Sequence, residues 1–235
     1  MKKILWIGRH DMKDIQRKQL EEYFDDEIEV KIYKLNLHRA EDAIQLAQDC
    51  DAIMAVLPPE KMQKLVCLNK KSGEKLILKA KGEHIPSGTL DFRTGKEIKQ
   101  FEHHYFEVIE DYIYDVEKLS GTQVCDVKSI LVVSQYSLTD LQKTDLREVF
   151  GTDVQIDEQK IQIENVAAFL QICEQYDAIA PFVTPELREQ IVPFSKKINI
   201  TSESERRKDS SEYKHKYWVR INRWEIKSKK LLKEI

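Results

Sequence analysis

The apolar residues of this 235-residue chain gather first into a short run and then onto a helical stripe. Lys3–Gly8 is almost entirely apolar, which is typical of a strand covered on both faces. In Met12–Phe24 the apolar residues recur at helical spacing, and Asp14 near the start suits the helix dipole. The two patterns then alternate, predicting strands at Ile28–Asn36 and Asp51–Pro58 and helices at Ala40–Cys50 and Pro59–Val66.

The residues that follow change to a pattern of two strands around a loop. Lys75–Lys81 and His103–Tyr114 have the pattern of strands, and glycine and proline gather between them in Gly82–Glu97. Such residues mark a turn or hairpin tip. Strands separated by helices and followed by a hairpin favour an α/β layered unit of Rossmann-like βαβαβ type, with a mostly parallel sheet and an antiparallel edge.

The chain then repeats itself at an offset of 126 residues. Lys2–Val66 aligns with Lys128–Val192 without a gap, and 16 of the 65 pairs are identical. Chance would give roughly 4 at ordinary residue usage. His103–Leu119 matches His215–Leu231 in the placement of aromatic residues. We therefore expect two tandem Rossmann-like units, each with a C-terminal β-hairpin and related by a pseudo-two-fold axis, at residues 1–121 and 127–235.

The second unit differs from the first in its hairpin and at its end. Its hairpin loop is shorter, and Ser202–Glu212 has the composition of a mobile loop. The apolar spacing in Glu225–Ile235 predicts a final amphipathic helix with a solvated basic face. The residues from Lys196 onward include 13 Lys/Arg and 6 Asp/Glu, so this segment is basic although the whole chain carries a formal charge of −3.

Composition limits the class of protein. The first apolar run is interrupted too early for a signal peptide, and no apolar run has membrane-spanning length. The four cysteines form no C-x-x-C pair and no zinc-site spacing. We expect a cytoplasmic protein with reduced thiols, in which Cys50 and Cys173 are buried.

Ligands of open α/β sheets bind beyond the carboxyl ends of the strands. In the first unit these loops supply a candidate anion site of Gly8, Arg9, His10, Asp11, His38 and Arg39. The corresponding loops of the second unit carry no cations, so only the first unit would bind a small anionic ligand or a nucleotide signal. The alternative is that these are ordinary exposed loop residues.

Other site chemistry lacks its signatures. Neither first strand is followed by G-x-G-x-x-G or by a P-loop sequence, so we expect no cofactor of those kinds. No nucleophile motif is present. A hydrolase or nuclease using His10 and Asp11 is the weakest alternative, because neighbouring strand residues point to opposite faces. The same geometry argues against a shared metal on His103 and His104.

The basic C-terminal segment is a second candidate surface. It interleaves cations with aromatic residues, and its candidate nucleic-acid or partner face is Lys214, Lys216, Trp218, Arg220 and Arg223. Aromatic residues recur at matching positions of the first unit. The alternative is therefore that they belong to the core and the lysines form a solvated face.

The opening MKKILWIGRHDM, followed by an acidic helix, resembles a group of short proteins from bacteriophages, prophages and mobile elements. Those proteins are typically one unit of this size and begin with a strand ending in Arg-His, then Asp/Glu and Met/Leu, which here are residues 9–12. They end in an aromatic-rich strand, as both units do. The second unit lacks the Arg-His pair. The resemblance implies a mobile-element accessory protein, including one that counters host defence, and it implies no particular activity.

Together these patterns favour a non-enzymatic accessory protein that binds a host or phage protein. The absence of catalytic signatures, the repeated scaffold and the uneven charge all suit this function. Binding of a small anionic ligand is the main alternative, and nucleic acid is a further candidate partner. No membrane partner is expected.

Overall fold

The computed structural model divides the chain into two compact units. It describes residues 1–8, 10–34, 37, 39–73, 75–90, 97–121, 126–161, 163, 165–206 and 213–232. Unit 1 consists of residues 1–113 together with 226–235, and unit 2 consists of residues 114–225. Each unit has its own hydrophobic core, so each is described separately below.

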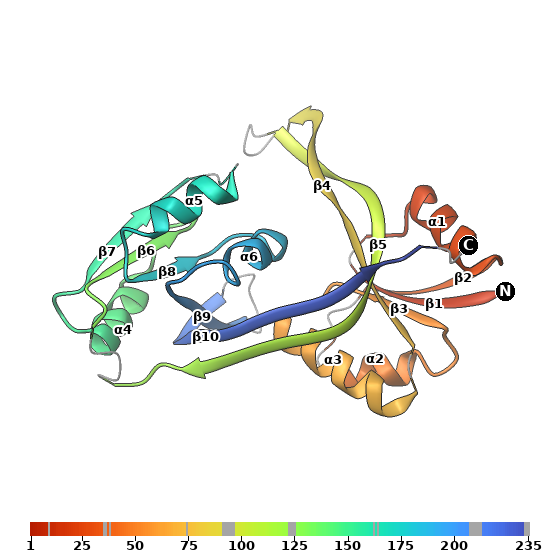
Figure 1. The fold of residues 1–235 in the computed structure, drawn as a ribbon, viewed down its shortest axis with the longest axis horizontal. Helices are drawn as coiled ribbons and strands as arrows, with labels where there is room; N and C mark the ends of the chain where they lie inside the picture. The colour runs from red at the N-terminus through yellow and green to blue at the C-terminus, as the bar shows by residue number, and fades with distance from the viewer. Residues whose placement is uncertain are drawn as a thin grey trace. The chain divides into compact units, whose positions relative to one another are not determined.

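Unit 1 is a layered α/β structure whose sheet is mostly parallel. Its elements are β1 (Lys2–Ile7), α1 (Asp14–Phe24), β2 (Ile28–Tyr33), α2 (Ala40–Leu46), β3 (Ala52–Ala55), α3 (Pro59–Ser72), β4 (Leu76–Leu90) and the first part of β5 (Glu97–Lys118). The strand order is β2-β1-β3-β4-β5, parallel from β2 to β4 and antiparallel between β4 and β5. Figure 1 shows α1 on one face of this sheet and α2 with α3 on the other.

Unit 2 repeats this order of elements. It contains β6 (Ser129–Val133), α4 (Asp140–Phe150), β7 (Gln155–Gln159), α5 (Val166–Cys173), β8 (Ala178–Pro181), α6 (Pro185–Ile191), β9 (Ile198–Arg206) and most of β10 (Tyr213–Lys230). The strand order is β7-β6-β8-β9-β10, parallel up to β9 and antiparallel between β9 and β10. The predicted α/β class with a mostly parallel sheet is confirmed.

Local sequence chemistry determines where the helices begin. The side chain of Thr139 accepts a hydrogen bond from the Gln142 backbone N–H at 3.3 Å, which caps α4. Asn165 caps α5 in the same way by accepting from Ala168 N at 3.0 Å. Pro59 occupies the first turn of α3, where a helix does not need its backbone N–H. These contacts satisfy or remove donors that a helix start leaves unpaired.

The alternation of β1 divides its side chains between two layers. Ile4 and Trp6 pack with Leu20 of α1 in one hydrophobic cluster. Leu5 and Ile7 are also buried and point to the opposite face, which α2 and α3 cover (Figure 1). The near-continuous apolar run of this strand thus reflects burial on both faces, as the sequence predicts.

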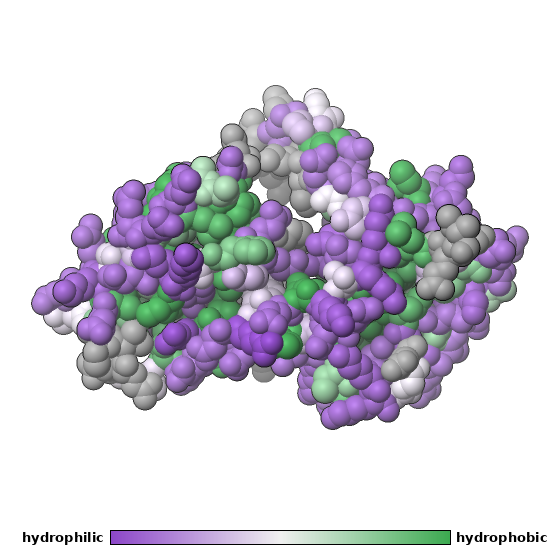
Figure 2. All heavy atoms as spheres, in the orientation of Figure 1, coloured by the Kyte–Doolittle hydropathy of each residue, from purple (hydrophilic) through white to green (hydrophobic). Residues whose placement is uncertain are grey.

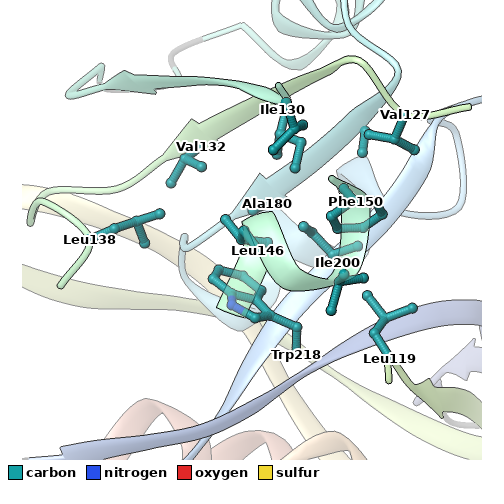
Figure 3. Close-up of a cluster of buried hydrophobic side chains, with 13 residues drawn as sticks. Leu119, Val127, Ile130, Val132, Leu138, Leu146, Phe150, Ala180, Ile200 and Trp218 are labelled. Carbon is teal, nitrogen blue, oxygen red and sulfur yellow. The ribbon is translucent and has the colours of Figure 1, made fainter. Parts of the chain in front are cut away.

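Unit 2 has the matching two-layer core. Figure 3 shows Ile130 and Val132 of β6 in one cluster with Leu146 of α4 and Trp218 of β10. The intervening residues of β6 pack in a second cluster with α5 and α6. Burying a side chain of this size contributes about 1.5–3 kcal/mol. These clusters are therefore the main stabilising feature of the unit.

The two units exchange the ends of their long strands. Leu119, just beyond β5, lies in the core of unit 2 and donates its backbone N–H to Trp218 O at 2.9 Å. Leu231, just beyond β10, lies in the core of unit 1 and donates to Phe106 O at 2.8 Å. The compact units therefore differ from the continuous ranges 1–121 and 127–235 expected from the sequence. The ranges differ because β5, with 22 residues, and β10, with 18, are long enough for each to contribute residues to both units.

Some local predictions fail in the C-terminal half. The amphipathic helix predicted at Glu225–Ile235 is wrong, because β10 continues as a strand to Lys230. The loop predicted at Ser202–Glu212 is wrong in its first part, since β9 extends to Arg206, and the remainder lies outside the described residues. The glycine-rich segment of the first unit pairs within the β4–β5 hairpin up to Leu90.

The surface is mainly hydrophilic. Figure 2 shows hydrophobic residues in separate groups among hydrophilic ones on the visible face. Within the described parts of the chain, none of the helices has both the length and the apolar character needed to cross a bilayer.

Candidate functional site

The strand-end loops of unit 1 contain the predicted anion site only in part. Gly8 continues the sheet by donating its backbone N–H to Tyr33 O at 3.3 Å. The side chain of His10 is exposed, while its carbonyl accepts from Trp6 Nε1 at 2.8 Å. Asp11 forms an ion pair of 2.8 Å with Lys34. Arg9 and His38, the other two central members of the prediction, lie outside the described residues.

The cations described at this edge are paired with carboxylates. Arg39 precedes α2, and its Nε lies 3.8 Å from Glu41 Oε2. Lys64 of α3 contacts the other oxygen of Glu41 at 2.7 Å, and this hydrogen bond lowers the pKa of that carboxyl group. With Lys34 held by Asp11, the described side chains do not form a cationic pocket. The arrangement gives no support to an anion site in this part of unit 1.

Unit 2 presents exposed apolar side chains at its strand-end edge. Tyr136, in the loop after β6, is 80% exposed, and Leu141 in the first turn of α4 is 48% exposed. Ile161, two residues after β7, is 38% exposed. Because β6 and β7 are parallel, with Val133 opposite Gln159, both loops leave the same edge of the sheet. We call Tyr136, Leu141 and Ile161 the unit 2 edge surface.

The loop that carries Tyr136 is held by local hydrogen bonds. The Tyr136 backbone N–H donates to Ser134 Oγ at 3.1 Å. Glu158 of β7 accepts from Leu138 N at 2.7 Å and pairs with Lys143 of α4 at 2.6 Å. The bond from Lys143 is the main reason why the pKa of Glu158 is lowered. The exposed tyrosine is therefore presented by an ordered loop whose carboxylate already has partners.

The predicted basic face of β10 is only partly a surface. Lys214 and Lys216 are exposed, and Arg220 is half-buried. Arg223 is exposed and forms an ion pair of 2.7 Å with Glu225. Trp218 is buried and donates its Nε1–H to Gln142 O at 3.1 Å, so it cannot stack on a partner.

The hypothesis of a combined aromatic and basic face is therefore wrong for Trp218. Its burial agrees with the alternative that the aromatic residues of β10 belong to the core. Lys214 and Lys216 are exposed, but without Trp218 they lack the stacking platform that single-stranded nucleic acid would use.

Unit 2 contains a hydrogen-bonded group of polar side chains that the sequence did not predict. His215 Nε2 lies 2.8 Å from Asp145 Oδ2, and His215 Nδ1 lies 2.5 Å from Ser202 Oγ. The three residue types are those of hydrolytic triads. The His215 side chain is only 2% exposed, however, and Gln142 of α4 also contacts Ser202. The imidazole is thus enclosed between sheet and helix, while Asp145 and Ser202 are partly exposed.

Unit 1 has a different arrangement at the matching place. His103 Nε2 lies 3.0 Å from Gln19 Oε1, and Gln19 Nε2 donates to His104 O at 3.4 Å, which fixes the orientation of the amide. His103 Nδ1 is buried and lacks a hydrogen-bond partner. Burial, and then the nearby charges of His104 and Lys13, lower the pKa of His103 to about 4. This imidazole is therefore neutral near pH 7.

Two of the described cysteines are poorly suited to act as nucleophiles. Cys50 and Cys173 are buried, as the sequence predicts. Burial raises the pKa of both thiols, to about 11 for Cys173, so neither is a thiolate at neutral pH. Cys67 is exposed, and Cys125 lies outside the described residues.

Comparisons with known proteins give few matches. No protein-family model matches the chain, and no curated protein matches it either. Among solved structures, it is similar to an NtrC family transcriptional regulator from Clostridium acetobutylicum, with 12% identity and a TM-score of 0.23 over 85% of this chain and 86% of that one. It is also similar to NAD+-bound 3-phosphoglycerate dehydrogenase from Entamoeba histolytica, with 13% identity and a TM-score of 0.23 over 79% of this chain and 64% of that one. Likenesses at this level carry no argument about function, so the α/β class rests on the strand order and helices described above.

Proposed function

We propose that this chain is a non-enzymatic accessory protein that binds another polypeptide through the unit 2 edge surface. The observation that carries the proposal is Tyr136, a large amphipathic side chain that is 80% exposed on a well-bonded loop. Tyrosine is enriched among the residues that dominate binding energy at protein interfaces. Leu141 and Ile161 add exposed apolar area at the same edge.

The order of the loop strengthens this interpretation. A surface that is already fixed before binding loses less side-chain and loop entropy on association. Single exposed apolar residues are common, but Tyr136 is a large one that lies at the edge of an α/β sheet where ligands bind. The carboxylate that contacts this loop, Glu158, is already bonded to Leu138 N and Lys143. Recognition is therefore better supported than catalysis.

The resemblance of residues 9–12 to phage and mobile-element proteins gives the proposal its biological context. The partner we propose is a host or phage protein, and counteracting a host defence system is the role that this context favours. Binding of a small anionic ligand is less well supported, because Lys34 and Arg39 are paired with carboxylates.

The proposal can be tested by quantitative affinity enrichment with the full-length tagged chain in its natural host. The variant Tyr136→Ser/Leu141→Ser removes the two most exposed side chains of the unit 2 edge surface without touching the core. We expect it to lose a partner that the parent chain retains. Truncating a tyrosine hot spot typically costs about 2 kcal/mol or more of binding, which is roughly a thirtyfold loss of affinity.

A matched control exists in unit 1. Ile15 in the first turn of α1 and Val56 after β3 are 58% and 65% exposed. The variant Ile15→Ser/Val56→Ser therefore makes a similar chemical change at the edge of the other unit, and it should retain the partner. An unchanged set of retained proteins for Tyr136→Ser/Leu141→Ser would contradict the proposal.

We further propose that the two units arose by duplication. Their backbone contacts support this origin at positions that the sequence alignment pairs. Asp51 accepts from Lys3 N at 2.8 Å, and Asp177 accepts from Ser129 N at 2.9 Å. Each aspartate begins an Asp-Ala-Ile sequence and joins the start of its third strand to the start of the first. The repeated tripeptide is thus explained by one repeated structural bond.

The exchanged strand ends support the same origin. Leu119 N donates to Trp218 O, and Leu231 N donates to Phe106 O. Leu119 aligns with Leu231, and Phe106 aligns with Trp218, each at an offset of 112 residues. An ancestral single unit would have exchanged these strand ends with a second copy of itself, and fusion would have preserved the exchange.

A further inference from the structure

The β4–β5 hairpin of unit 1 carries two glutamates and a histidine in one exposed group. Glu83 lies directly opposite Glu102 in the antiparallel register, and His104 Nε2 is 3.7 Å from Glu83 Oε1. One potential ligand atom from each residue lies within 4.8 Å of the others. Among the described residues, no lysine or arginine forms an ion pair with either glutamate.

A β-bulge places His104 in this group. The register shifts between Lys81 and Gly82, so that His103 pairs with Gly82 and His104 is the extra residue. A Cβ atom on Gly82 would lie 1.8 Å from the Glu102 carbonyl oxygen, so this close approach requires glycine. Bulges re-aim side chains and often do so at functional places. His103 points into the core while His104 remains exposed.

Unit 2 has the same bulge with different chemistry. Its register shifts between His215 and Tyr217, so that Lys216 occupies the position of His104. Lys214 occupies the register position in unit 2 that Glu102 occupies in unit 1. Like charges directly opposite each other destabilise an antiparallel pair, and opposite charges stabilise it. Unit 2 therefore has lysines at the two positions where unit 1 has Glu102 and His104.

We propose that Glu83, Glu102 and His104 bind a divalent transition-metal ion of the Zn²⁺ class. Two carboxylate oxygens and one imidazole nitrogen form a ligand set that Zn²⁺ accepts, with water in the fourth position. The ion would take the place of the lysines of unit 2 and remove the repulsion between the glutamates. Ca²⁺ and Mg²⁺ prefer oxygen ligands and larger coordination numbers, so they should bind far more weakly.

The geometry allows this with small side-chain movements. Tetrahedral coordination at about 2.0–2.1 Å places neighbouring ligand atoms about 3.3 Å apart. The three side chains begin within 4.8 Å of one another and are exposed, so rotamer changes suffice to close the difference. The predicted consequence is a metal-dependent stiffening of the hairpin.

The test is a ZnCl₂ titration of the untagged full-length chain by isothermal calorimetry. The exposed thiol is removed from every sample by Cys67→Ser, because it could bind zinc by itself. We expect one Zn²⁺ per chain at this site. His104→Ala should weaken binding by about tenfold or more, since one of three protein ligands is lost. CaCl₂ should produce no comparable heat.

A more specific variant introduces into unit 1 the residue type that unit 2 has at the matching position. Glu102→Lys places lysine at the position of Lys214 and should abolish Zn²⁺ binding. It should also raise the metal-free melting temperature by about 1–2 °C, because a repulsive pair becomes an attractive one. Glu117→Lys makes the same charge change elsewhere on β5 at an exposed position and should leave Zn²⁺ binding intact.

Two outcomes would overturn the proposal. One is a parent chain that binds no Zn²⁺ in the titration. The other is Zn²⁺ binding that His104→Ala and Glu102→Lys leave at the affinity of the parent chain, which would assign the ion to other residues. Neither outcome bears on the unit 2 edge surface, because no residue is shared between the two surfaces.

Discussion

The two units build the same strand order around buried histidines with different partners. His215 of unit 2 has a partner on each ring nitrogen, Asp145 and Ser202. His103 of unit 1 has Gln19 on one nitrogen and nothing on the other. The backbone position is the same, but only unit 2 supplies a carboxylate and a hydroxyl.

The difference shows that a shared fold does not fix its interior polar chemistry. The register pairs Ala80 with Phe106 and Ser202 with Trp218, so Ala80 occupies the position of Ser202. An alanine cannot bond to an imidazole, and this is why Nδ1 of His103 has no partner. A buried imidazole nitrogen without a partner resists the charged form, as in His103. The comparison can be tested by changing each unit separately.

The largest effect is expected from Gly82→Ala. The added Cβ would overlap the Glu102 carbonyl oxygen, so the hairpin backbone must shift. Overpacking of this kind costs typically 1–3 kcal/mol, and we expect about 3 kcal/mol because the obstacle is backbone. Unit 2 has Ser204 at this position, and Ser204→Ala is therefore the control, with an expected change within about 0.5 kcal/mol. Urea unfolding measures both, and equal effects would show that the close approach is not specific to unit 1.

Acid should weaken unit 1 through His103. Its pKa is about 4 in the folded chain and 6.5 as the ordinary value, so the unfolded state binds more protons between these limits. The contribution of the neutral His103 to the free energy of unfolding is therefore fully present above pH 6.5. It is lost as the pH falls to about 4, and the loss is up to about 3 kcal/mol. Urea unfolding at several pH values measures this slope.

Protonation of carboxylates also lowers the unfolding free energy in acid, so the pH dependence caused by His103 must be separated from theirs. His103→Leu supplies the comparison, because it keeps the side chain apolar and removes the titration. The difference in unfolding free energy between parent and variant should change with pH between 6.5 and 4 and be constant above 7. A constant difference over the whole range would contradict the assignment of a neutral, buried imidazole.

A smaller loss of unfolding free energy is expected when the partners of His215 in unit 2 are made to resemble those of His103 in unit 1. Asp145→Asn/Ser202→Ala replaces the charged acceptor by an amide and removes the hydroxyl partner of His215. Losing a hydrogen bond to a charged group costs about 1.5–3 kcal/mol, and the retained amide offsets part of it. We expect a loss of about 1–2 kcal/mol at pH 7.5 in urea unfolding. The mirror change Ala80→Ser gives His103 a partner and should not destabilise unit 1; if it does, the empty nitrogen is not the feature that separates the units.

The sequence could predict the repeated layers but not the features that distinguish them. The apolar run of β1 and the helical spacing of α1 are local patterns, and both elements form where those patterns predict. The helix predicted at Glu225–Ile235 fails because pairing with β5 overrides local spacing, as the bond from Leu231 N to Phe106 O shows. Tertiary pairing of this kind leaves no local signal.

The candidate sites could not be predicted from the sequence for a related reason. Bringing Glu83 to Glu102 and His104 depends on the hairpin register and on a bulge, neither of which can be read from residue spacing. The exposure of Tyr136 depends on which loop residues the core leaves uncovered. The sequence identified the strand-end loops as the place for a site, yet it favoured the cations of unit 1 over the apolar side chains of unit 2.

The smallest expected effects should be equal in the two units. Lys118 Nζ lies 4.6 Å from the ring centre of Tyr217, and Lys230 Nζ lies 4.8 Å from that of Tyr105. Each lysine follows a long strand into the other unit and meets the matching tyrosine there. A cation–π contact at an exposed position contributes about 0.5–1 kcal/mol. We therefore expect Lys118→Met and Lys230→Met each to lower the unfolding free energy by about 0.5 kcal/mol, as measured by urea unfolding at low salt. A loss several times larger for one lysine than for the other would show that the exchanged strand ends are not energetically equivalent, although their geometry is the same.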